Sequence, residues 1–183
     1  MPVLALRAVA GGPEEGVGGM ELDPVELEPG SAQLSPDQVD HAGLVANGLS
    51  ARPDIGLVLM GRGSEADEPF LRAEALLERI EAGGFAPYDE RDLLERRRLR
   101  RGVERRVQLQ PDELDPEDAA LIGEWLEEMD VSSEARDRLA GARADAVRSV
   151  LVDAHGTDPA QVRIGEPQEG PPGVAIELFV TVQ

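Results

Sequence analysis

Residues 55–61 read IGLVLMG, an apolar run without a single charge. A short continuous run of this kind is typical of a central β-strand that is buried on both faces. Arg52-Pro53 precedes it and the polar loop GRGSEADEP follows from residue 61. The run therefore predicts the strand around which the rest of the chain is arranged.

A helix is predicted immediately before this strand. In Ser35-Pro36-Asp37-Gln38, Ser suits the N-cap, Pro suits the first helical position, and Gln three residues after the cap can reach back to it. Apolar residues then recur at helical spacing as far as Leu49. Upstream, VELE (25–28) predicts a short strand, so the chain begins with a β-α-β order.

Three helical segments are predicted after the central strand. Residues 70–82 have helical spacing and end at Gly83-Gly84. Asp115-Pro116 predicts the start of a second helix that includes the only Trp, Trp125. Ser132 or Ser133 is expected to cap a third helix, which contains LAGARADAVRSVL (139–151).

Two further strands complete the pattern, QVRIG (161–165) and VAIELFVTV (174–182), with a Pro/Gly-rich turn between them. The order β-α-β-α-β-β predicts a small α/β sandwich in which the helices cover one face of a mixed sheet. We expect a flexible lead-in at 1–24 and a single domain at 25–183. Residues 69–130 are expected to be a helical insertion packed at the edge of the sheet, with Trp125 anchoring it to the domain body.

Composition lowers the expectation for several kinds of partner. The chain has 183 residues, 37 acidic and 18 basic, and a net charge of −19. Such a charge repels nucleic acid and anionic lipid at long range. No apolar run approaches the roughly 20 residues that span a bilayer. We therefore expect neither nucleic-acid binding nor a direct membrane span in this sequence.

The residues do not predict an enzyme. Without cysteine the chain has neither disulfides nor a thiolate metal site. His41 and His155 lack metal-ligand spacing, and no Ser/His/acid order or paired carboxylates form a recognisable catalytic motif. We accordingly expect no catalytic residue, no metal and no cofactor.

Seven arginines between positions 96 and 106 could indicate nucleic-acid binding. They lack interleaved aromatic residues, however, and acidic residues accompany them: Asp92 and Glu95 just before the stretch and Glu104 within it. We therefore expect these arginines to be solvated or to pair with acidic residues of the same chain.

Several segments in a fixed order resemble a known family. They are SAQL (31–34), LVLMG (57–61), LAGARADAVRSVL (139–151) and QVRIG (161–165). This series is similar to the OmpA-like C-terminal domain, in the divergent form at the C-terminus of large periplasmic AsmA-like proteins, a domain-of-unknown-function family. Glu26 through Pro36, Gly61-Arg62 and Val131 through Val147 extend the resemblance over nearly the whole chain.

The resemblance implies a function as well as a fold. It implies a periplasmic, non-enzymatic envelope-binding or anchoring module, as the C-terminal part of a larger inner-membrane-anchored protein. The partner would be an envelope protein or peptidoglycan. The alternatives are a purely structural cap of a lipid-handling β-rich protein, or a weak peptidoglycan-binding domain.

The resemblance also assigns candidate ligand-binding residues. In relatives that bind peptidoglycan, an Asp after the second strand and an Arg in the motif N-x-x-LS-x-x-RA-x-x-V together hold the diaminopimelate group. Here the Arg is matched by Arg143, whereas the Asn position holds Arg136. The Asp position holds Ser64, with Asp67 three residues later. Loss of that carboxylate removes the partner of the ligand's ammonium group, so weak peptidoglycan binding is expected.

Arg143 has two interpretations. At about 100° per residue, the stripe Ala135, Leu139, Ala142, Ala146 and Val150 forms the buried face of the helix, and Arg143 lies beside it. Its guanidinium could pair with an acidic residue of the 64–68 loop, Glu65 or Asp67, and stabilise that loop. It could equally contact a ligand.

Overall fold

The computed structural model describes residues 21–110 and 114–180, which form two compact units. The sheet unit consists of the described residues up to Glu28, Ala32–Gly63, and those from Asp137 onward. The helical unit consists of Pro29–Ser31 and Ser64–Arg136. It is wider at both ends than the predicted insertion at 69–130, and it includes a short stretch from before the first helix.

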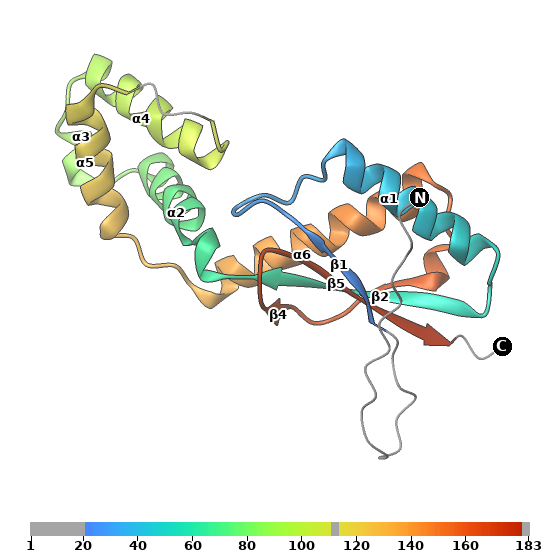
Figure 1. Cartoon of the computed structure of the whole chain (residues 1–183). Helices are drawn as coiled ribbons and strands as arrows, with labels where there is room; N and C mark the ends of the chain where they lie inside the picture. The colour runs from blue at the N-terminus through green and yellow to red at the C-terminus, as the bar shows by residue number, and fades with distance from the viewer. Residues whose placement is uncertain (1–20, 111–113, 181–183) are drawn as a thin grey trace. The chain divides into compact units, whose positions relative to one another are not determined.

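The sheet unit contains the five-stranded mixed sheet of the protein (Figure 1). Its main strands lie in the order β1-β5-β2-β3, and the two-residue β4 also pairs with β2. The strand bounds are β1 Glu21–Glu26, β2 Ile55–Gly63, β3 Val162–Ile164, β4 Gln168–Glu169 and β5 Gly173–Val180. β2 is parallel to β3 and β4 but antiparallel to β5. The predicted mixed α/β class and the β-α-β-α-β-β order are confirmed, with β4 as an addition inside the predicted turn.

Two long helices, α1 (Pro36–Ser50) and α6 (Ser133–Ser149), cover one face of this sheet (Figure 1). A single apolar core lies between the layers, and its members come from both helices, the strands and the adjoining segments: Leu27, Ala42, Ala46, Leu49, Leu57, Leu59, Ala144, Val147, Leu151, Val162, Val174 and Ile176. Val58, on the opposite face of β2, is only half-buried. Gly56 and Met60 lie on the same face as Val58 and are buried, so the prediction that this strand is buried on both faces is confirmed except at Val58.

The helix starts follow the predicted capping chemistry. The Ser35 hydroxyl accepts from the Gln38 amide at 3.3 Å, and Gln38 Oε1 accepts from the Ser35 amide at 2.6 Å. At α6, the Ser132 hydroxyl accepts from the Ala135 amide at 3.1 Å, which identifies Ser132 as the cap. These starts depend on a few adjacent residues, and the sequence therefore predicts them well.

The first strand differs from its prediction. β1 begins at Glu21, not at Val25, and it pairs antiparallel with β5. The strand includes Pro24, and its register shifts between Leu22 and Val25. A proline and a bulge are tolerated at the edge of a sheet, although they break the alternation that identifies a strand in sequence. Residues 1–20 of the expected lead-in lie outside the described part of the chain.

The buried face of α6 also differs from the predicted stripe. It consists of Leu139, Ala140, Arg143, Ala144 and Val147, so Arg143 lies within the buried face and not beside it. The helix turns this face inward because Ala140 is small and lies directly over Gly61 of β2. A Cβ atom built on Gly61 would lie 1.7 Å from the carbonyl oxygen of Ala140.

The helical unit contains helices and no strand among its described residues (Figure 1). A 3₁₀ turn, η1 (Glu65–Asp67), leads into α2 (Glu68–Ala82), α3 (Ala86–Asp89) and α4 (Leu93–Val107). Residues 111–113 lie outside the described chain, and α5 (Pro116–Glu127) follows them. As predicted, Asp115 caps α5, where its carboxylate accepts from the Glu117 amide at 2.9 Å.

One apolar core holds the helical unit together, and its members come from all four of its α-helices and the joining segments: Leu76, Ile80, Phe85, Tyr88, Leu99, Val103, Ile122, Trp125 and Met129. Trp125 packs edge-on against Phe85, with ring centroids 5.2 Å apart. Trp125 is therefore part of the core of the helical unit, and its predicted role as an anchor to the domain body stays a prediction.

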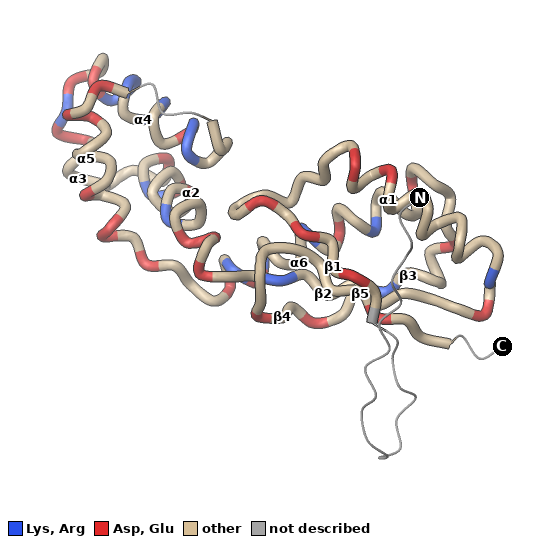
Figure 2. The backbone as a smooth tube through the Cα atoms, viewed as in Figure 1, with Lys and Arg blue, Asp and Glu red and all other residues tan. Residues whose placement is uncertain are grey.

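Arginine positions lie along α4 (Figure 2), and two of these arginines pair with acidic residues of the same unit. Arg98 donates to Asp118 of α5 at 2.9 Å, and this hydrogen bond raises the pKa of the Arg98 guanidinium. Arg100 pairs with Glu81 at 2.6 Å and with Glu104 at 2.7 Å. Intramolecular pairing, expected for this cluster from its interleaved acids, is confirmed for these two arginines.

Candidate functional site

Arg143 is fully buried, with 0% of its surface exposed, in the middle of α6. Its Nη1 atom donates to the carbonyl oxygen of Arg62 at 2.6 Å, and Nη2 donates to the carbonyl oxygen of Glu28 at 3.4 Å. The guanidinium thus joins the end of β2 to the segment that follows β1. Pairing of Arg143 with Glu65 or Asp67 stays a prediction.

The other candidate ligand residues lie in the helical unit. Asp67 is 1% exposed, and each of its oxygens accepts a main-chain amide. Oδ1 accepts from Gly30 at 2.7 Å, and Oδ2 accepts from Ser64 at 2.9 Å. Arg136 pairs with Glu68 at 2.7 Å. The structure therefore brings Ser64 and Asp67 together, but as parts of a hydrogen-bonded turn that also holds Gly30.

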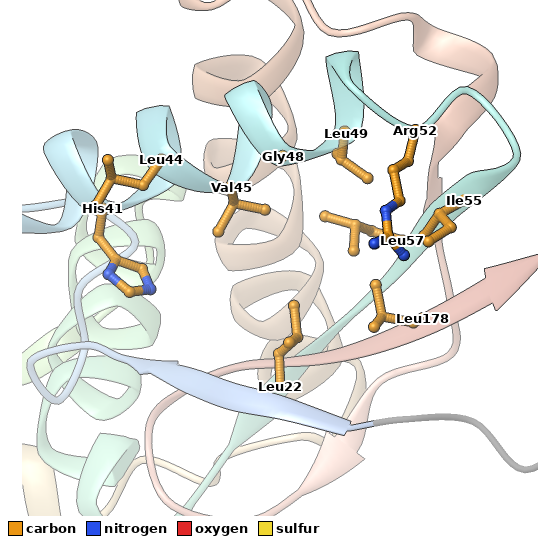
Figure 3. Close-up of a pocket in the computed structure, with 10 residues that line it drawn as sticks. All are labelled: Leu22, His41, Leu44, Val45, Gly48, Leu49, Arg52, Ile55, Leu57 and Leu178. Carbon is orange, nitrogen blue, oxygen red and sulfur yellow. The ribbon is translucent and has the colours of Figure 1, made fainter. Parts of the chain in front are cut away.

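A different feature of the sheet unit has the geometry of a binding site. A pocket of about 450 Å³ lies between α1 and the sheet (Figure 3). Seven of its lining side chains are aliphatic, and they come from four segments of the chain: Leu22, Leu44, Val45, Leu49, Ile55, Leu57 and Leu178. The volume lies within the range of roughly 300–1,000 Å³ that is usual for small-molecule sites.

Polar side chains occupy the two ends of this pocket. His41 lies near the start of α1, and Arg52 lies just beyond the end of the same helix (Figure 3). The Arg52 side chain extends down toward Ile55 and Leu57 (Figure 3). The arrangement is an aliphatic channel along one helix face, with a permanent cation at one end.

Gly48 leaves the middle of the helical wall open. A Cβ atom built at this position would meet no atom within 4 Å. Beside it, Leu44 keeps 63% of its surface exposed at the rim of the pocket. A glycine inside a helix lowers the stability of the helix by about 1 kcal/mol relative to alanine. Helix stability therefore does not explain why position 48 is a glycine.

The sequence contained a partial signal for this pocket. Val45 and Leu49 are among the apolar residues at helical spacing, and Leu44 next to Val45 adds a further aliphatic side chain to that side of the helix. Gly48, in the middle of a predicted helix, is the second sign. Leu22 and Leu178 could not be associated with the site, because they reach it through strand pairing far along the chain.

A metal site is absent from the described residues. Within 21–110 and 114–180, no three His, Cys, Asp or Glu side chains are grouped so as to hold a metal ion. Over the same part of the chain, no helix has both the length and the apolar character required to cross a membrane.

Comparison of the chain with family models, with curated proteins and with solved structures found no match.

Proposed function

We propose that this protein is a non-enzymatic binding module of the cell envelope that holds an apolar ligand in the pocket between α1 and the sheet. The observation that carries the proposal is the aliphatic pocket itself, about 450 Å³ in volume and left open at Gly48. Burial of apolar surface supplies about 0.8 kcal/mol per CH₂ group, so a pocket of this size can give useful affinity without charged contacts.

The envelope setting comes from the OmpA-like resemblance. It supports a periplasmic module at the C-terminus of an AsmA-like protein, attached to an envelope protein or to peptidoglycan. The β-α-β-α-β-β order of the sheet unit agrees with the fold that this resemblance implies. A purely structural cap is the second candidate, and the burial of Arg143 favours it, because the guanidinium serves main-chain carbonyls of the protein itself.

The first test uses a neutral fluorescent probe, N-phenyl-1-naphthylamine, whose emission rises in apolar surroundings. We expect the native protein to bind it. Gly48→Phe and Val45→Trp, which place rings on the pocket wall, should raise the Kd about tenfold or more, because displacement of two CH₂ equivalents already has that effect. Gly48→Ala is the matched control and should keep the native Kd.

Circular dichroism shows whether each variant keeps its helical content. If the native protein does not bind the probe, or if both ring variants fold and bind as tightly as the native protein, the pocket is not a binding site. The structural cap would then be the better proposal.

Peptidoglycan binding through the assigned residues should be weak. The Asp position holds Ser64, both oxygens of Asp67 accept main-chain amides, and Arg143 is inaccessible to solvent. We expect purified sacculi to retain little of the protein at physiological salt in a sedimentation assay. Tight retention that Arg143→Lys abolishes in a folded protein would contradict this prediction and support a ligand contact at Arg143.

A further inference from the structure

We propose that the pocket ligand is a single-chain carboxylate, with its alkyl chain along α1 and its carboxylate paired with Arg52. This inference rests on the proposed binding function of the pocket, and it specifies the chemical class of the ligand. It depends on two independent features. One is the shape of the aliphatic channel, and the other is the charge of the Arg52 guanidinium, which pairs with no acidic residue among the described residues.

The shape of the channel fits one alkyl chain. His41 and Arg52 both line the pocket, His41 in α1 and Arg52 two residues beyond its last residue, Ser50. At about 1.5 Å per residue, the helix between His41 and Ser50 spans about 14 Å. An aliphatic pocket of about 450 Å³ along that length has room for an extended alkyl chain. The lining contains aliphatic side chains and one imidazole, but no Phe, Tyr or Trp that would favour stacking of an aromatic ligand.

Arg52 is the one permanently charged side chain among the ten lining residues. Within the described chain its guanidinium has no hydrogen-bond or ion-pair partner, although Asp54 is only two residues away. The net charge of the protein is −19, so acidic groups are abundant elsewhere. A guanidinium offers two parallel N–H donors that match a carboxylate, which makes it suited to the head of such a ligand.

The main chain around Arg52 is held in place by Gln161. The Gln161 side-chain amide is 7% exposed and donates to three carbonyl oxygens at the turn between α1 and β2. It reaches Arg52 at 3.1 Å, Ile55 at 2.7 Å and Leu49 at 3.3 Å. The cation therefore projects from a fixed turn at the end of the channel, which reduces the entropy lost when a carboxylate binds.

The test compares ligands that share one tail but differ in the head. Dodecanoate, dodecanol and dodecyl phosphate, each below its critical micelle concentration, are titrated against the probe-bound protein in mildly alkaline buffer. We expect dodecanoate to bind about tenfold more tightly than dodecanol, the size of effect that a hydrogen-bonded charge pair gives. In Arg52→Gln this ratio should fall to near one, whereas the affinity for dodecanol should stay unchanged.

The control for charge is Arg97→Gln, an exposed arginine of α4 that does not line the pocket and should keep the native ratio. The inference is overturned if dodecanol binds as well as dodecanoate, or if Arg52→Gln keeps the preference for dodecanoate. Tighter binding of dodecyl phosphate would assign a phosphate head instead of a carboxylate. These outcomes leave probe binding intact, whereas failure of the proposed function would abolish probe binding itself.

Discussion

Gly61→Ala should destabilise the sheet unit by about 3 kcal/mol or more, at the upper end of what overpacking costs. A Cβ atom at position 61 would lie 1.7 Å from the carbonyl oxygen of Ala140 and 2.4 Å from its carbonyl carbon. Both are main-chain atoms of α6, so no side-chain rotation can relieve the clash. The helix would have to move away from β2, and the buried core on either side of Gly61 would open.

Urea unfolding followed by far-ultraviolet circular dichroism measures this effect. Gly141→Ala is a matched control on the same helix, because its Cβ atom would meet nothing within 4 Å. That variant should gain about 0.5–1 kcal/mol from the helix propensity of alanine. If Gly61→Ala unfolds at the native urea concentration, β2 and α6 are not in main-chain contact and the assigned register of α6 is incorrect.

The sequence predicts local features of this fold better than distant ones. The Ser35 and Asp115 caps depend on residues within one helical turn, and both are found as expected. The central strand is equally clear, because seven consecutive uncharged residues, most of them apolar, form a run too short for most helices. The predicted buried face of α6 is wrong, because alanines occur all around this helix. Their pattern does not indicate that Ala140 is the one that lies over Gly61 of β2.

The core of the helical unit also depends on contacts between residues that are distant in the sequence. Its apolar residues form three short clusters in the sequence, each too small for a core. Phe85 and Tyr88, in a stretch without periodicity, join these clusters into one core. Whether this unit folds alone stays an open prediction, and expression of 64–136 with a thermal melt would test it.

The role of Arg143 also depends on distant contacts. A family motif identifies it as a candidate ligand residue, but an arginine on an apolar helix face fits a ligand contact and a structural hydrogen bond equally well. The partners that distinguish the two, the carbonyl oxygens of Arg62 and Glu28, are 81 and 115 positions away. Arg52 was unremarkable in the sequence as part of a helix end, and it gains significance only from the pocket around it.

Arg143→Met should therefore cost about 3 kcal/mol of stability, since hydrogen bonds from a charged donor contribute about 1.5–3 kcal/mol each and their loss leaves buried carbonyls unsatisfied. Methionine preserves much of the apolar stem, so the loss reports the guanidinium rather than a cavity. Arg148→Met, in the last turn of the same helix and partly exposed, is the control and should cost less than about 1 kcal/mol.

The comparison with Arg143→Lys separates a structural bond from a ligand contact. Two nitrogens of the guanidinium reach two carbonyls in different segments, one after β1 and one in β2. A lysine carries the same charge on a single nitrogen, so it can replace one of these bonds but not both, and we expect a stability between those of the native protein and Arg143→Met. Urea unfolding of the native protein, Arg143→Lys and Arg143→Met measures the order of their stabilities directly. If Arg143 acted mainly on a ligand, all three would unfold at the same urea concentration and differ only in binding. A graded loss of stability, with probe binding preserved in the folded variants, would identify Arg143 as the side chain that fixes α6 to β2 and to the segment after β1. The pocket beside α1 would then remain the place where ligands bind.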